Sequence, residues 1–137
     1  MKAWILGAVL TLTVSPLAAG AANAFPGTWR GMASVNGMSC TITVAMTAHA
    51  TYSQIAQCGG YATGQSGPYR VFPNGTITLD VTDWTPRRRL IHGAYGDHFE
   101  TNAQPAGGSY AYTFKSPNTM VWRDIHYNGV ITFHRVH

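Results

Sequence analysis

Two cysteines are the reactive side chains whose role the sequence predicts most clearly. Cys40 and Cys58 are the only cysteines in the chain. They lack the C-x-x-C spacing of redox-active pairs. In an oxidising compartment we expect a structural disulfide, provided that the fold brings the two Cα atoms within about 7 Å of each other. A reactive thiol pair is the alternative interpretation.

The remaining polar residues form no pattern that indicates catalysis. Two histidines and two acids in the segment 92–100 could each donate a metal ligand, but their spacing matches no established metal site. No serine stands in a Gly-x-Ser-x-Gly turn. Asp80 and Asp83 are three residues apart, which places them on opposite faces of a strand. We therefore expect no enzyme activity, no metal ion and no cofactor.

The basic residues do not indicate a nucleic-acid-binding surface. Arg87, Arg88 and Arg89 are adjacent, whereas the other basic residues are scattered. Nucleic-acid-binding proteins usually present a broader basic face with interleaved aromatic residues. We expect the arginine run to lie in a solvated loop, where it could also contact a protein partner.

The N-terminus has the pattern of a cleavable signal peptide. Lys2 precedes the apolar run 3–14, and Ala22-Asn23-Ala24 has the form that signal peptidase prefers. A dozen apolar residues rise only about 18 Å as a helix, too short for the roughly 30 Å bilayer core. Removal of 24 of the 137 residues leaves 113, enough for one domain at 25–137. We expect a periplasmic or extracellular protein of a Gram-negative bacterium, without a stable membrane anchor.

Alternating polar and apolar residues, with turn signals every 8 to 12 residues, predict an all-β domain. The clearest hairpin spans 39–58 and folds about His49. In this register Cys40 faces Cys58, and the apolar residues of both strands share one face. The same register therefore explains the hydrophobic pattern and the disulfide.

Two further hairpins are expected around recognisable turns. A turn at Pro73-Asn74-Gly75 would pair Tyr69 with Leu79. A two-residue turn at Asn128-Gly129 would pair Trp122 with Arg135. Between 84 and 108 the pattern is weakest, with strands expected near 88–92 and 98–101. The total is about eight strands in an up-and-down order, which closes most readily into a barrel.

Motifs at both ends of the mature chain resemble those of the calycins, the group that contains lipocalins and avidins. The first is Gly27-Thr28-Trp29, and the second is Thr132-Phe133-His134-Arg135-Val136. The resemblance implies a lipocalin-like, eight-stranded antiparallel barrel in which Arg135 packs over Trp29 and closes one end. The avidin-type asparagine expected two residues after the tryptophan is replaced by Gly31, so we do not expect biotin binding.

Two functions from different classes follow from this fold. The first is binding of a small apolar ligand inside the barrel. The candidate cavity residues for this function are Tyr52, Gln54, Tyr69, Tyr112 and Trp122. The second is a secreted or periplasmic interaction protein, such as a protease or lysozyme inhibitor, that acts through Phe25-Pro26 or the arginine loop. A roomy cavity would favour the first function, and a filled barrel the second. The oligomeric state is left open.

Overall fold

The structure, a computed structural model, describes residues 22–137 and is built almost entirely of β-strands. The predicted signal peptide at 1–24 falls outside this range except for its last three residues, which are helical. The strands are β1 (Gly27–Val35), β2 (Met38–Met46), β3 (Thr51–Cys58), β4 (Tyr61–Phe72), β5 (Thr76–Leu79), β6 (Asp83–Thr85), β7 (Arg88–Gly93), β8 (Gly96–Thr101), β9 (Gly108–Ser116), β10 (Thr119–Asp124) and β11 (Val130–Arg135). Within residues 22–137, no helix has the length and hydropathy needed to cross a lipid bilayer.

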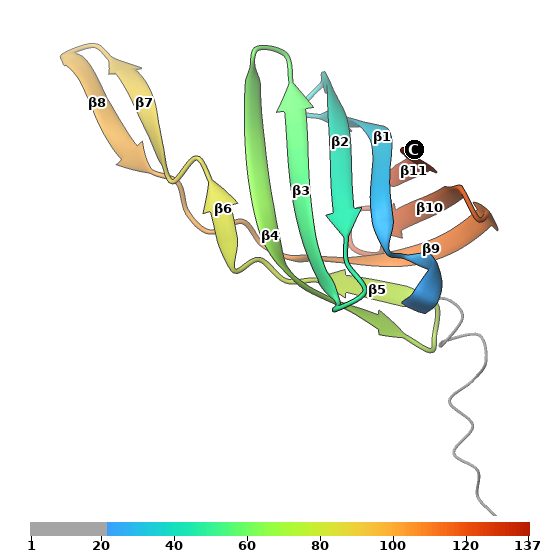
Figure 1. Cartoon of the computed structure of the whole chain (residues 1–137). Helices are drawn as coiled ribbons and strands as arrows, with labels where there is room; N and C mark the ends of the chain where they lie inside the picture. The colour runs from blue at the N-terminus through green and yellow to red at the C-terminus, as the bar shows by residue number, and fades with distance from the viewer. Residues whose placement is uncertain (1–21) are drawn as a thin grey trace, which may run out of the picture.

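Eight of these strands close into the antiparallel barrel that the sequence predicts (Figure 1). The order around the barrel is β1-β2-β3-β4-β5-β9-β10-β11, and β11 returns to pair with β1. Because every neighbour in the barrel is paired, closure removes the free sheet edges that an open meander would expose. Three strands, β6, β7 and β8, lie outside this ring. The sequence predicts strands at the positions of β7 and β8, but it does not predict that they leave the barrel.

The predicted hairpin of β2 and β3 is confirmed in its register. Cys40 is the partner of Cys58, and the two form a disulfide with Cα atoms 4.3 Å apart. Alternate residues of β2, from Cys40 to Met46, are buried inside the barrel. The disulfide is consistent with an oxidising, exported environment.

The hairpin at Pro73-Asn74-Gly75 is also confirmed, with Tyr69 paired to Leu79. The register predicted for the Asn128-Gly129 hairpin is wrong by four residues. Trp122 pairs with Ile131 instead of Arg135, because the loop spans five residues and not two. The side chain of Asp124 accepts hydrogen bonds from the backbone N–H groups of residues 126 and 127, which stabilises the longer loop.

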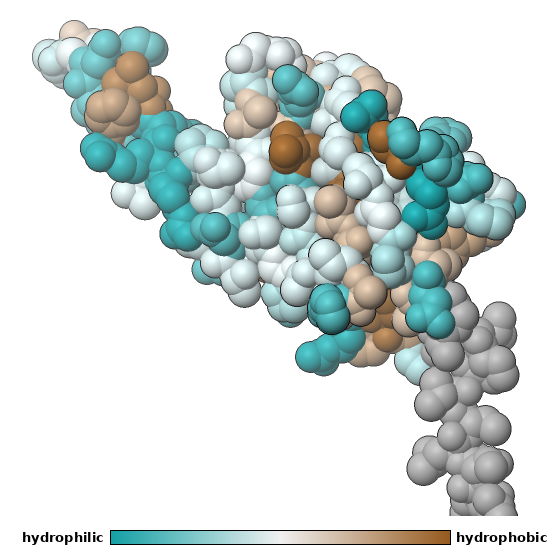
Figure 2. Space-filling model, in the orientation of Figure 1, coloured by the Kyte–Doolittle hydropathy of each residue, from teal (hydrophilic) through white to brown (hydrophobic). Residues whose placement is uncertain are grey.

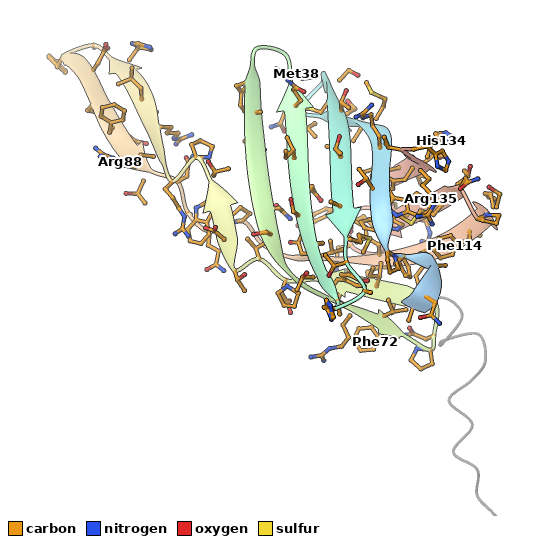
Figure 3. The ribbon with its side chains drawn as sticks, in the orientation of Figure 1. Met38, Phe72, Arg88, Phe114, His134 and Arg135 are labelled. Atoms are coloured by element: carbon orange, nitrogen blue, oxygen red, sulfur yellow. A yellow bond between two sulfur atoms is a disulfide. The ribbon has the colours of Figure 1, made fainter. Side chains whose placement is uncertain are left out.

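One end of the barrel is closed by a cluster around Phe25, Trp29 and Arg135. The guanidinium of Arg135 lies 4.2 Å from the Trp29 ring centroid, as the calycin-like motif predicts. It also donates to the carbonyl oxygens of Pro26 at 2.8 Å and Pro117 at 3.2 Å. Figure 3 shows Arg135 and Phe114 on this side of the molecule. Gly27 is required here, since it has φ of 135° and a Cβ on it would collide with the guanidinium.

The interior is occupied by hydrophobic side chains from all eight barrel strands. The largest fully buried ones are Trp29, Phe25, Phe133, Ile77, Leu79, Met120, Val44 and Cys40. Partly buried aromatic residues of β9 pack against this cluster. Phe25 is entirely inaccessible, so the Phe25-Pro26 segment is not the exposed contact element expected from the sequence.

The chain leaves the barrel wall after β5. The partner of β4 shifts by one residue, from Tyr69 opposite Leu79 to Ser66 opposite Asp83, which marks a bulge between β5 and β6. The strand β6 continues along β4 and leads into β7 and β8, which pair only with each other within residues 22–137. This hairpin, Arg88–Thr101, projects away from the barrel and is called the arm below (Figure 1).

Candidate functional site

The five residues predicted to line a cavity separate into two groups. Tyr52 and Gln54 lie on β3 and Trp122 on β10, whereas Tyr69 and Tyr112 lie at the end closed by Phe25. The ring of Phe25 is 4.9 Å from that of Tyr112 and 6.2 Å from that of Tyr69. At that end the two tyrosines therefore pack against Phe25 as part of the hydrophobic core.

Tyr52 belongs to a polar network on the inner wall. Its hydroxyl donates to the carbonyl oxygen of Asp80 at 2.8 Å and accepts from Nε2 of Gln65 at 3.2 Å. Gln65 lies opposite Gln54, so the two amide side chains share the inner face of β3 and β4. Burial raises the pKa of Tyr52, partly offset by the bond from Gln65, so its phenol stays neutral over the ordinary pH range.

Tyr110 connects this network to Trp122. The two rings are 5.1 Å apart, and burial, with smaller effects from Asp124 and Tyr52, raises the pKa of Tyr110. Trp122 is 2% exposed, and its Nε1–H has no acceptor among the described residues. A buried donor without an acceptor costs about 1–3 kcal/mol, so a water or ligand acceptor at this position would stabilise the barrel.

A pocket lies where β4 and β6 meet the coil that follows the arm. Its volume is about 270 Å³, and it is called the Trp84 pocket below. It is lined by Thr63, Gly64, Gln65, Trp84, Thr85, Pro86, Asn102, Ala103 and Pro105, none of which is charged. Three of these residues, Gln65, Trp84 and Asn102, form hydrogen bonds through their side chains.

The root of the arm is held by bonds around Trp84. The Trp84 Nε1–H donates to the carbonyl oxygen of Asn102 at 3.1 Å, and the guanidinium of Arg87 lies 3.5 Å from the Trp84 ring centroid. Arg87 also pairs with Asp83 at 2.7 Å, and this hydrogen bond lowers the pKa of the Asp83 carboxyl. The prediction of an arginine loop is therefore wrong for Arg88 and Arg89, which lie in β7, and Arg87 stabilises the base of the arm.

The arm exposes an apolar pair beside a cation. Leu90 and Phe99 face each other across the two strands and are 45% and 61% exposed. Arg88, labelled in Figure 3, lies 4.7 Å from the Phe99 ring centroid. Tyr95 at the tip is fully exposed. Figure 2 shows brown, hydrophobic surface on the arm, bordered by hydrophilic surface.

Apart from Arg88, the charged residues of the arm are engaged in pairs. Arg89 lies 3.3 Å from Glu100, and His98 lies 3.1 Å from the same carboxylate. The hydrogen bonds from His98 and Arg89 lower the pKa of Glu100. His92 pairs with Asp97 at 2.9 Å. In the part of the chain that the structure describes, no three such groups converge as metal ligands.

Sequence reasoning missed Gln65, Trp84 and Asn102. Gln65 could have been found by continuing the β2–β3 register through the turn at Gly59-Gly60, since this places it opposite Gln54. No local pattern connects Trp84 with Asn102, because they are 18 positions apart and the arm lies between them.

Comparison of the chain with protein-family models, with curated protein sequences and with solved structures gives no match.

Proposed function

We propose that the protein is an exported interaction protein whose arm binds a protein partner. The observation that carries this proposal is the exposed Leu90–Phe99 pair on a projecting hairpin. A two-stranded hairpin has little stability on its own, and exposed apolar side chains gain free energy when a partner covers them. The occupied interior of the barrel favours the same interpretation, because it leaves the surface as the means of action.

The proposal also covers export of the protein and its relation to a known group of barrels. We propose that residues 1–24 direct export and are removed, and that the mature domain is related to the calycin group. The support is the signal-peptide pattern, the disulfide, and the contact of Arg135 with Trp29 in a closed eight-stranded barrel.

Site-specific photocrosslinking tests the proposal. A photoreactive residue replaces Phe99 on the arm or, as the control, Gln57, which is exposed on the barrel wall. In the protein's own exported compartment, we expect one discrete adduct from position 99 and none from position 57. A second substitution, Leu90→Ser, should reduce the adduct while leaving the free energy of unfolding within about 0.5 kcal/mol of the parent. Equal adducts from both positions, or none from position 99, would contradict the proposal.

Binding of a small apolar ligand inside the barrel is the second candidate function. It is favoured by the Nε1–H of Trp122, which has no acceptor within residues 22–137 and which a ligand carrying an acceptor atom would satisfy. Titration with the apolar dye 1-anilinonaphthalene-8-sulfonate tests it. Saturable fluorescence that falls in Trp122→Phe would support an internal site, and no saturable signal would contradict it.

A further inference from the structure

The hydrogen bonds around the Trp84 pocket point to a ligand class different from the apolar one expected from the sequence. We infer that this pocket binds a neutral small molecule rich in hydroxyl or amide donors, with the chemistry of a single sugar ring. The inference rests on which atoms of two amide side chains remain available, and it does not depend on the function of the arm.

The first amide is that of Gln65, whose orientation is determined by its partner. The hydroxyl of Tyr52 uses its proton on the carbonyl oxygen of Asp80, so it can only accept from Gln65. The amide nitrogen of Gln65 must therefore face Tyr52, as it does at 3.2 Å. This leaves Oε1, which has no donor among the described residues, for a ligand.

The second amide is that of Asn102. Its Nδ2 donates to the carbonyl oxygen of Pro86 at 2.8 Å, and a carbonyl can only accept. The amide is thus oriented with its nitrogen toward Pro86, and Oδ1 is the atom without a donor in the described part of the chain. Each amide therefore keeps an acceptor oxygen toward which a ligand can direct an O–H or N–H donor.

None of the nine lining residues is charged, and two of them offer apolar ring surface. A carboxylate, which carries acceptors only, would find donors in the hydroxyl groups of Thr63 and Thr85, but it would meet no cation among the nine lining residues and would face the two amide oxygens. The indole of Trp84 and the ring of Pro105 offer apolar surface for the C–H face of a ring. A volume of about 270 Å³ lies just below the roughly 300–1,000 Å³ of typical ligand pockets, which suits one ring and not a lipid chain.

The wild-type mature protein provides the first test. Glucose and N-acetylglucosamine are added to isotopically labelled protein, and the side-chain NH₂ signals of Gln65 and Asn102 are followed by NMR. We expect saturable shifts of both signals with a Kd of about 1–10 mM, and at least tenfold weaker effects from gluconate, which is anionic. Absence of saturable shifts for both neutral sugars, or equal shifts with gluconate, would overturn the inference.

A matched pair of variants provides the second test. Gln65→Met removes the amide and keeps the length of the side chain, whereas Gln104→Met removes a neighbouring amide that donates to Val81 and does not line the pocket. Binding should weaken at least tenfold in Gln65→Met and stay unchanged in Gln104→Met. Equal loss in both, or loss in neither, would refute the assignment. Photocrosslinking from the arm is unaffected by either result, so this inference and the proposed function can fail separately.

Discussion

Replacing Arg135 by alanine should destabilise the barrel because this side chain joins three segments at the closed end. Its guanidinium stacks on Trp29 at 4.2 Å and donates to the carbonyl oxygens of Pro26 and Pro117. A cation over an indole contributes about 0.5–2 kcal/mol. The shorter bond, to Pro26, is part-buried and contributes about 1.5 kcal/mol as a charged donor.

Together these contributions predict a loss of about 2–3.5 kcal/mol in the free energy of unfolding for Arg135→Ala. The bond from Arg135 to the carbonyl oxygen of Ala24 adds nothing in the mature protein, since cleavage after this residue would remove the partner. Arg135→Lys should recover less than half of the loss, because an ammonium keeps the charge but cannot stack or donate as a planar fork.

Urea denaturation of the mature protein, followed by tryptophan fluorescence, measures this loss. The control is Arg123→Ala on the adjacent strand β10, where the side chain is exposed and should change stability by less than about 0.5 kcal/mol. If Arg135→Ala also stays within that limit, the guanidinium does not stabilise the closed end and the reasoning is wrong. Full recovery in Arg135→Lys would show that charge, rather than stacking, carries the effect.

Three other perturbations test the core, the disulfide and the buried phenols. Phe25→Ala should lower the free energy of unfolding by about 3–5 kcal/mol in urea denaturation, because the ring is wholly buried against three aromatic residues. A loss below about 1 kcal/mol would mean that the closed end repacks around the smaller side chain. Serine at both Cys40 and Cys58, separated by 18 positions, should lower the free energy of unfolding by about 3 kcal/mol, because the disulfide restricts the unfolded chain. Unchanged stability would contradict this explanation. Burial raises the pKa of Tyr110 above its unfolded value of 10.0, so the folded state keeps a proton that the unfolded state loses. Stability should therefore fall as the pH rises above 10, and denaturation of Tyr110→Phe should show a shallower fall than the parent.

The sequence predicted the β2–β3 hairpin because two independent patterns agreed on one register. Alternation alone allows any even shift of a strand, since such a shift keeps the same residues on the inner face. The requirement that Cys40 meet Cys58 removed this freedom. Trp29 and Arg135 were likewise predicted together because the first and last strands of a closed barrel must be neighbours.

The hairpin after β10 shows what happens without such a second constraint. The shift of four residues is even, so the inner face of β10 and β11 remained correct while every pair was wrong. Asn128-Gly129 is a strong turn signal, but Asp124 forms side-chain bonds to the backbone that favour a longer loop. When two local turn signals compete, their hydrogen bonds decide which turn forms. The sequence pattern does not show which set of hydrogen bonds is more stable.

The arm was predicted as strands but not as a separate element. Residues 88–92 and 98–101 do lie in β7 and β8, and a free hairpin has the same alternation and turn as two barrel strands. The distinguishing property is that every residue of β8 is exposed and β7 has only one partly buried residue, which agrees with the many charged side chains in this segment. A barrel strand needs one apolar face, so charges on both faces could have excluded these two strands from the barrel.

The Trp84 pocket could not be predicted from the sequence, because it depends on the pairing of the arm. Gln65 could be placed on the inner face by extending a confirmed register, and Trp84 follows because it is the partner of Gln65 on β6. Asn102 reaches the pocket only because the arm is a closed hairpin whose two ends return to the same point, where Asn102 N–H donates to the carbonyl oxygen of Arg87 at 2.8 Å. The arm therefore has a structural consequence apart from any partner, since its pairing brings Asn102 beside Trp84. A change that opened the hairpin should remove the pocket, whereas Leu90→Ser, which alters only an exposed face, should leave sugar binding intact.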